Sequence, residues 1–294
     1  DTGQQNDFIA EILGPSGTVL GATIPTPATP PSFRNSDLSG KIGIDFKTAG
    51  DDLIYASISR GYRAPSFNAQ AFFDPSEVSV AEKETVYAYE IGAKSQFANN
   101  SVTLNLAGFY YDYRDQQSIN VDQLTGAQTL LNIPKSRIFG GEAELTAYLN
   151  DSVTLRSAVG LLNTKIKRGI VNGIDISGNN LVNAPSLNFS GGFDVTAFDN
   201  GSGKLSLHGD LSYITSQFFE IVNVPRLEQN GYALLSGHIN WKSANGRFVA
   251  SIWGKNLTNK FYFTSRIDLL AGFGFDYNHV GTPRTYGITA GVNF

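Results

Sequence analysis

Apolar and polar side chains alternate one by one along most of this chain, and this period of two restricts the fold more than any other feature. In Lys41–Lys47 and Leu205–Tyr213 every second residue is apolar or glycine, and most residues between them are polar or charged. Phe139–Ala147 and Tyr232–Trp241 repeat the pattern. Successive side chains of a β-strand point to opposite faces, so these segments predict strands with one apolar and one polar face. About eleven such strands of roughly 11 to 16 residues can be drawn, longer than the strands usual in soluble sheets.

The connections between these strands are of two kinds, short polar turns and long segments, and the two kinds alternate strictly along the chain. Outer-membrane barrels have short periplasmic turns and long extracellular loops. We therefore predict an all-β fold, a transmembrane antiparallel up-and-down β-barrel. A soluble sandwich or propeller would explain the period of two but neither the strand lengths nor the alternation. The short turns are expected at 49–52, 98–100, 150–151, 199–203 and 243–246, and the long loops at 65–83, 114–133, 169–184, 217–229 and 264–281.

Composition excludes several other classes of protein. No run of about 18 apolar residues exists, which excludes a helical membrane protein. The absence of Cys removes disulfides, thiolate catalysis and Cys-metal sites. The net charge of −4 and the lack of a basic face argue against a nucleic-acid partner. The sequence has no HExxH, GxSxG or P-loop motif, so we expect no enzyme and no cofactor.

The chain ends on an alternating strand with a terminal aromatic residue. This ending resembles the signal by which the bacterial barrel-assembly machinery recognises its clients. The C-terminus is then expected in the periplasm, and counting strands backwards places residues 1–37 outside the cell. The signal residues are Tyr286, Ile288, Ala290, Val292 and Phe294.

Eleven strands with an external N-terminus do not suit a complete barrel, because bacterial single-chain barrels have an even number of strands. We expect these strands to be the second half of a barrel of about 22 strands. Residues 1–37 are then an extracellular loop region that includes the end of an upstream strand or an extra hairpin, and residues 38–294 are the C-terminal part of the barrel.

One predicted strand departs from the alternation. Val102, Leu104 and Leu106 share one face, but Phe109 and Tyr111 continue the apolar pattern on the other face. A β-bulge near Leu106 would restore a single lipid face and place Tyr111 and Tyr113 in the outer aromatic girdle. A strand partly buried against protein would explain the pattern equally well.

Seven segments between Leu38 and Phe294 resemble segments of TonB-dependent receptors, and they occur in the order of that family. Each motif is short, and together they identify the chain as resembling the C-terminal half of the receptor barrel. They are YASISRGYRAPSF (55–67), ETVYAYEIGAK (84–94), LNLAGFYYDYRDQQ (104–117), FGGEAELTA (139–147), NAPSLNFS (183–190), WGKNLTNKFY (253–262) and GTPRTYGITAGVNF (281–294).

The resemblance implies active import across the outer membrane of a Gram-negative bacterium. In this family an N-terminal plug fills the barrel, binds the ligand together with the extracellular loops and contacts TonB. The plug is absent from this sequence. The partners implied are outer-membrane lipid, the barrel-assembly machinery, the protein's own plug, TonB and a small molecule such as a ferric siderophore. A passive porin is the alternative, and an outer-membrane enzyme or adhesin is a third hypothesis.

Five residues are candidate ligand contacts. Arg60, Tyr62 and Arg63 near the outer mouth could contact an anionic ferric siderophore, or pack on the plug or wall. The segment after Ala64 lacks the loop His and the NPNL segment of haem receptors in the family, which disfavours haem.

His208 and His238 lie on neighbouring predicted strands, where a symmetric hairpin would place them opposite each other in the lumen, close to Asp210. A transition-metal or haem site could be built in this way. The competing interpretation is polar lining of the lumen, which we also favour for Glu142 and Glu144. No metal site is therefore predicted.

Overall fold

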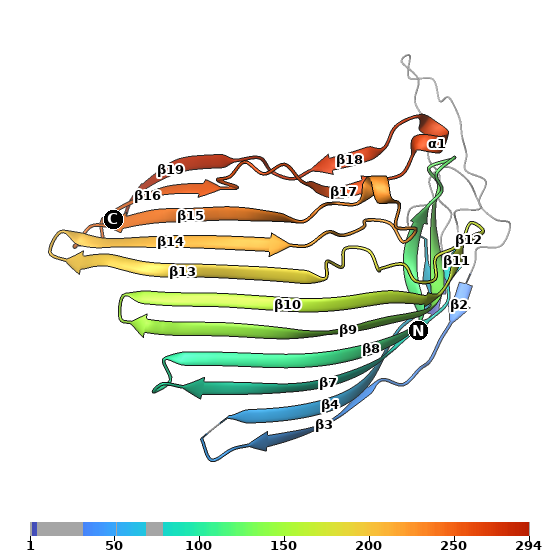
Figure 1. Ribbon diagram of the computed structural model, residues 1–294, viewed down its shortest axis with the longest axis horizontal. Helices are drawn as coiled ribbons and strands as arrows, with labels where there is room; N and C mark the ends of the chain where they lie inside the picture. Colours follow the sequence, from blue (N-terminus) through green and yellow to red (C-terminus); the bar gives the residue numbers. More distant parts are fainter. Residues whose placement is uncertain (1, 5–31, 51, 69–78, 294) are drawn as a thin grey trace.

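The computed structural model describes residues 2–4, 32–50, 52–68 and 79–293, and its dominant element is one antiparallel sheet of 11 strands (Figure 1). The strand order follows the chain, so each strand pairs with the strands before and after it in the sheet. From one edge to the other the strands are β3 (Gly40–Lys47), β4 (Leu53–Arg63), β7 (Glu84–Phe97), β8 (Val102–Val121), β9 (Gln128–Asn150), β10 (Val153–Arg168), β13 (Leu187–Asn200), β14 (Gly203–Ile214), β15 (Tyr232–Lys242), β16 (Phe248–Lys255) and β19 (Thr285–Val292).

Smaller elements lie outside this sheet, and each pairs locally. No helix in the described parts of the chain is long and apolar enough to cross a membrane. The small strand pairs are β1 (Thr2–Gln4) with β2 (Ser32–Arg34), β5 (Ser66–Phe67) with β6 (Val80–Ala81), β11 (Ile170–Val171) with β12 (Ile174–Asp175), and β17 (Phe263–Ile267) with β18 (Tyr277–Val280); the helices are η2 (Pro225–Leu227), a 3-10 turn, and α1 (Leu270–Phe273).

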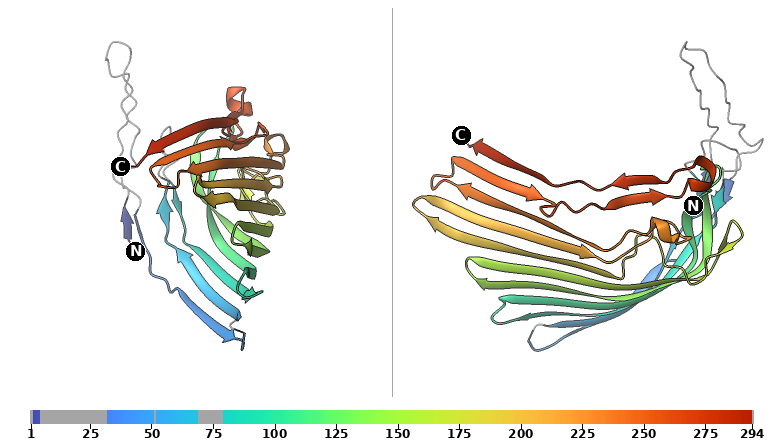
Figure 2. Two further views of the ribbon diagram at one scale, coloured as in Figure 1. Left: turned by 90° about the vertical axis from the view of Figure 1, so that its left-hand side faces the viewer. Right: turned by 45° about the horizontal axis from the view of Figure 1, so that its top comes forward.

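The two ends of the sheet differ as the sequence predicts. The short turns lie at the end where the chain terminates, and the long connections lie at the opposite end (Figure 1). The expected eleven strands and their up-and-down order are confirmed. The sheet is curved but open, and neither β3 nor β19 pairs with a further strand among the described residues (Figure 2).

One face of the sheet carries an apolar band that crosses its strands. A cross-strand row runs from Val195 through Leu207, Ile239 and Ile252 to Ile288. These side chains are open to the surroundings, and Ile288 is 77% exposed. Apolar surface costs about 25 cal/mol for each Å² left in water, whereas lipid chains cover it without that cost. This face is therefore the lipid side of the sheet.

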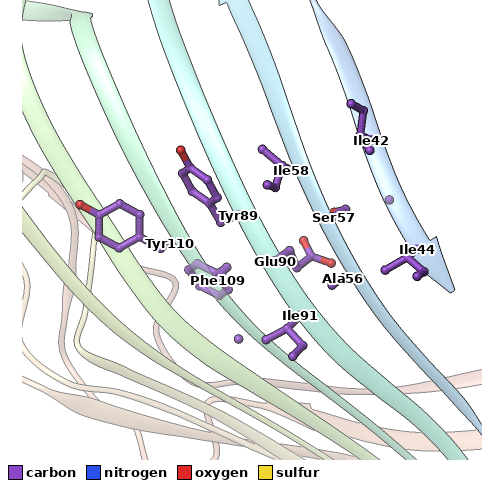
Figure 3. A pocket seen from close by; sticks show the side chains of 12 residues that line it. Ile42, Ile44, Ala56, Ser57, Ile58, Tyr89, Glu90, Ile91, Phe109 and Tyr110 are labelled. Carbon is purple, nitrogen blue, oxygen red and sulfur yellow. The ribbon is translucent and has the colours of Figure 1, made fainter. Parts of the chain in front are cut away.

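On the same face a shallow apolar hollow of about 560 Å³ spans β3, β4, β7 and β8 (Figure 3). The hollow follows from side-chain size, because Ala56 and Gly108 lie in one cross-strand row with the larger Ile44 and Ile91. The opposite face carries most of the polar residues and is the lumen side.

The expected bulge near Leu106 is wrong. The pairing of β8 with β7 and with β9 runs without interruption from Val102 to Arg114. Phe109 and Tyr111 therefore lie on the lumen side, where their rings stack with centroids 5.0 Å apart. Gly140 on β9 leaves room for Phe109, since a Cβ at that position would come within 2.9 Å of the ring. Burial against protein, the other explanation of this strand, stays a prediction.

The predicted long loop at 114–133 is also wrong, because β8 and β9 continue as a hairpin joined by residues 122–127. The hairpin changes direction at Asp115, which has the left-handed φ of 52°, and at Pro134, which has no N–H to donate. Beyond this point it rises above the sheet towards α1 (Figure 2).

The tip of the hairpin is fixed to the connection between β16 and β19. The N–H of Gly272 in α1 donates to the carbonyl of Gln123 at 3.0 Å. A Cβ at Gly272 would lie 2.0 Å from the oxygen of Leu124, so only glycine permits this approach. The hairpin therefore reaches across the ends of the strands between β9 and β19.

The long connections pack around an apolar core of their own. Six buried residues form it, and they come from β9, β10, the β11–β12 hairpin and two connections. Two asparagines hold the connections together, since Asn179 donates to the carbonyls of Ile221 and Val222 at 2.9 Å and Asn223 donates to the carbonyl of Asn180 at 3.0 Å. The loop core consists of Ile133, Ile166, Val171, Ile176, Leu181 and Ile221.

Candidate ligand site at the extracellular mouth

A hollow of about 470 Å³ lies among the long connections, between the β8–β9 hairpin, the connection 215–231, β17 and the end of β4. We call it the mouth pocket. Its lining brings together segments that are far apart in sequence. Two guanidinium groups, one carboxyl group and several side-chain amides face it, among them Arg63, Arg266, Glu220, Gln117, Asn120 and Gln128.

The two guanidinium groups of the mouth pocket have no carboxylate partner among the described residues. Arg63 is exposed at the end of β4, and its side chain makes no ion pair or hydrogen bond to any residue that the structure describes. Arg266 on β17 donates to the side-chain oxygen of Asn278 at 2.6 Å and to the carbonyl of Arg226 at 2.9 Å. Both positive charges are therefore available to an anionic ligand.

Glu220 is the one carboxyl group in the lining of the mouth pocket. Burial raises the pKa of Glu220, and the neighbouring Asp268 carboxylate raises it further. Its Oε1 accepts a hydrogen bond from the backbone N–H of Asp268 at 3.1 Å. Two guanidinium groups against one carboxyl group leave the lining of the mouth pocket with a formal excess of positive charge.

An ion-pair cluster next to the mouth pocket ties two connections together. Arg226 donates two hydrogen bonds to Asp276, from Nη2 at 2.9 Å and from Nε at 3.2 Å, and it also contacts Asp268. The two-point geometry of an arginine with a carboxylate fixes orientation as well as distance. The side chain of Asp268 is only 4% exposed, whereas that of Arg226 is 39% exposed, so the carboxylate is the buried member of this pair.

The structure separates the three mouth residues that the sequence groups together. β4 pairs without a register shift, so Arg60 and Tyr62 lie on the same face as Ile58, the lipid side, and Arg63 lies on the lumen side. Arg60 donates to Asp37 at 2.9 Å and to the hydroxyl of Tyr87 at 3.3 Å. Only Arg63 reaches the mouth pocket.

His208 and His238 are directly opposite each other on β14 and β15, on the lumen side. Their rings stack with centroids 4.6 Å apart. Both ring nitrogens of His208 face carboxylates, with Nδ1 at 2.8 Å from Asp194 and Nε2 at 2.6 Å from Asp210. Arg156 pairs with Asp194 on its other side.

This arrangement gives the histidine pair no metal geometry. In the described ranges no group of three or more His, Asp or Glu residues could hold a metal ion. Both nitrogens of His208 contact carboxylates, so His208 belongs to a hydrogen-bonded network on the lumen side, and the His238 ring stacks on it. Its role as a ligand contact stays a prediction.

Some residues of these sites could not be predicted from the sequence. Arg266 and Glu220 lie in long connections without any periodic pattern, so no sequence signal places them beside Arg63. Asp194 could have been found, because the alternation along β13 places it on the lumen side opposite His208.

The proposed assembly signal lies on the last strand. Tyr286, Ile288, Ala290 and Val292 share the lipid side of β19, where they pair with the alternating residues of β16. Phe294 lies outside the described residues. The role of these residues in assembly stays a prediction.

An open antiparallel sheet with one lipid face, one polar face, short turns at one end and folded loops at the other defines part of an outer-membrane β-barrel. Residues 15–257 match the family described as TonB dependent receptor-like, beta-barrel, and the chain belongs to this family. The family places the protein in the outer membrane of Gram-negative bacteria.

Solved structures of the same architecture agree with this assignment of the fold. The ferric yersiniabactin uptake receptor FyuA from Yersinia pestis is 20% identical, with a TM-score of 0.74 over 94% of this chain and 40% of that chain. The siderophore receptor PiuA from Acinetobacter baumannii is 18% identical, with a TM-score of 0.68 over 92% and 38%. The copper transporter OprC is 14% identical, with a TM-score of 0.69 over 93% and 42%. The chain therefore spans about 40% of the length of these proteins.

Proposed function

We propose that this protein imports a bulky anionic nutrient, a ferric siderophore or a similar iron complex, across the outer membrane with energy delivered through TonB. The observation that carries the proposal is the mouth pocket of a TonB-dependent receptor barrel, with the uncompensated guanidinium groups of Arg63 and Arg266. Arginine suits carboxylate and other oxygen-rich anions because its planar fork donates two parallel hydrogen bonds.

Two of the similar structures are named for siderophore uptake and one for copper. Copper ions favour thiolate, thioether and imidazole ligands. This chain has no Cys and no Met, and its described residues hold no cluster suited to a metal ion. An iron complex that presents its own oxygen atoms fits the lining of the mouth pocket better than a bare copper ion.

The proposed receptor has further parts and partners. We infer that the chain forms the second half of the barrel from residue 38 onwards, and that an upstream region supplies the remaining strands, a plug and the segment that contacts TonB. His208 and His238 would then face the plug or the passing ligand from the lumen wall. Barrel assembly through the terminal strand, and transport without catalysis, belong to the same proposal.

We expect Arg63→Gln combined with Arg266→Gln to lower iron uptake at limiting substrate at least tenfold. Each lost hydrogen bond to a charged group costs about 1.5–3 kcal/mol, and about 1.4 kcal/mol corresponds to a tenfold change in affinity. The measurement is uptake of radiolabelled iron, given as ferric citrate and as a ferric catecholate complex, in iron-starved cells.

Arg60→Gln is the matched control, because Arg60 lies on the lipid side of the same strand, and its uptake should equal that of the wild type. Unchanged uptake in the double variant would contradict the assigned pocket. Uptake that persists after deletion of TonB would instead favour a passive porin.

A further inference from the structure

Aromatic residues mark the upper border of the apolar face on β7, β8 and β9. Tyr89, Tyr110 and Phe139 lie in one cross-strand row on the lipid side. Tyr89 and Tyr110 also line the apolar hollow (Figure 3). The three residues are between 40% and 44% exposed. Aromatic girdles of membrane barrels lie at the level where lipid chains meet lipid headgroups. The next residues towards the long connections therefore lie at the level of the extracellular headgroups.

Those next positions on the lipid side are strongly basic, so the expectation from the sequence that the chain has no basic face is wrong. In the row directly above, Tyr87 pairs with Asp112, Asp112 with Arg137 and Arg137 with Lys165. In the following row, Arg114 pairs with Lys135 and Lys135 with Arg168. We call the six charged residues of these rows the headgroup patch: Arg114, Lys135, Arg137, Lys165, Arg168 and Asp112.

The charge of the headgroup patch is unbalanced. Five cations and one carboxylate give a formal charge of +5 − 1 = +4 on a chain whose net charge is −4. Arg114, Lys135 and Arg168 are direct cross-strand neighbours, and like charges in such positions destabilise a sheet. An external anion would remove this repulsion.

The contacts inside the headgroup patch leave most of its charge free. Asp112 forms ion pairs at 3.7 Å with Arg114 and with Lys135, and its single negative charge offsets only one of the five positive charges. The side chains of Arg114 and Lys135 are 57% and 49% exposed. Nε of Arg137 is buried and finds no hydrogen-bond partner in the described part of the chain, while its Nη2 donates to Asn163 at 3.3 Å.

Basic residues on the lipid side of these rows continue to Arg60 on β4, which pairs with Tyr87 in the sheet. Arg60 donates to Asp37 at 2.9 Å, so its charge is compensated. The five cations of β8, β9 and β10 share the single carboxylate of Asp112.

We propose that the headgroup patch binds the phosphate groups of a phosphorylated lipid of the extracellular leaflet. Arginine and lysine are the side chains that bind phosphate, and arginine does so with paired hydrogen bonds. The apolar rows below offer the same lipid a surface for its acyl chains, including the hollow beside Tyr89 and Tyr110 (Figure 3). A phosphate headgroup joined to acyl chains matches both surfaces at once.

The test compares the full-length receptor with a variant that carries Arg114→Gln, Lys135→Gln and Arg137→Gln. Each is purified in detergent and titrated with diphosphorylated lipid A and with its dephosphorylated form, and bound lipid is counted by native mass spectrometry. We expect at least tenfold weaker binding of the phosphorylated lipid by the variant, and equally weak binding of the dephosphorylated form by both proteins. Inorganic phosphate alone should bind neither protein at comparable concentrations.

A matched control carries Lys94→Gln, Lys204→Gln and Lys242→Gln, which remove three cations from the lumen side. Heat-modifiable migration shows whether each variant forms a barrel, and Arg114→Gln alone gives a milder second measure. Equal binding of phosphorylated lipid A by the wild type and the headgroup variant would overturn the proposal, as would tight binding of inorganic phosphate alone. Iron uptake by the headgroup variant should match that of the wild type. The lipid-binding proposal and the proposed transport function are therefore tested by separate measurements.

Discussion

Leu207→Arg is expected to lower the amount of assembled barrel in the outer membrane at least tenfold, whereas Ser206→Arg should leave it close to the wild-type level. Leu207 lies on the lipid side between Val195 and Ile239. A guanidinium group there would face the hydrocarbon layer, at a cost of about 2–4 kcal/mol near the middle of the bilayer. The measurement is the amount of heat-modifiable protein in purified outer membranes.

Ser206 is the matched control because it is the next residue on the same strand and points to the lumen. It lies opposite Thr196 and Asn240, and an arginine there remains in a polar environment. Equal assembly of the two variants would mean that the two faces are assigned incorrectly.

Ile166→Asp is expected to disorder the extracellular connections while the sheet remains intact. Ile166 is 0% exposed in the loop core. Burying a carboxyl group without a hydrogen-bond partner in such a site costs several kcal/mol. This cost exceeds the stability that a small core contributes to the connections. Limited proteolysis of intact cells should then cut the connections within minutes, and binding of the ferric ligand should fall at least tenfold.

Ile170→Asp serves as its control. Ile170 lies four residues further along the chain in β11 and is 73% exposed, so the same substitution should change neither proteolysis nor binding. Cleavage of both variants at the wild-type rate would show that the connections are not held by this core.

The sheet could be predicted because a strand has a fixed period. Each apolar residue determines the face of its neighbours, and short turns determine which strands pair. The positions of His208 and His238 followed from this reasoning alone, and the structure confirms that they lie opposite each other. The same period also separates Arg60 from Arg63, although both belong to one family-like motif.

The connections could not be predicted in the same way. The β8–β9 hairpin continues beyond Asp115 and Pro134 without an alternating apolar face, so its residues resemble a loop in the sequence. The mouth pocket combines Arg63, Glu220 and Arg266 through contacts between distant connections. Such contacts depend on the packing of the loop core and leave no periodic signal.

The most direct test of the central claim, that these strands are half of a TonB-dependent receptor barrel, is the intact mass of the native protein extracted from outer membranes. We predict a heat-modifiable protein of more than twice the 31.8 kDa of this chain, because the remaining strands and the plug must be part of it. A native, heat-modifiable protein with a mass near 31.8 kDa would contradict this account, since the eleven strands would then form a barrel without an upstream half.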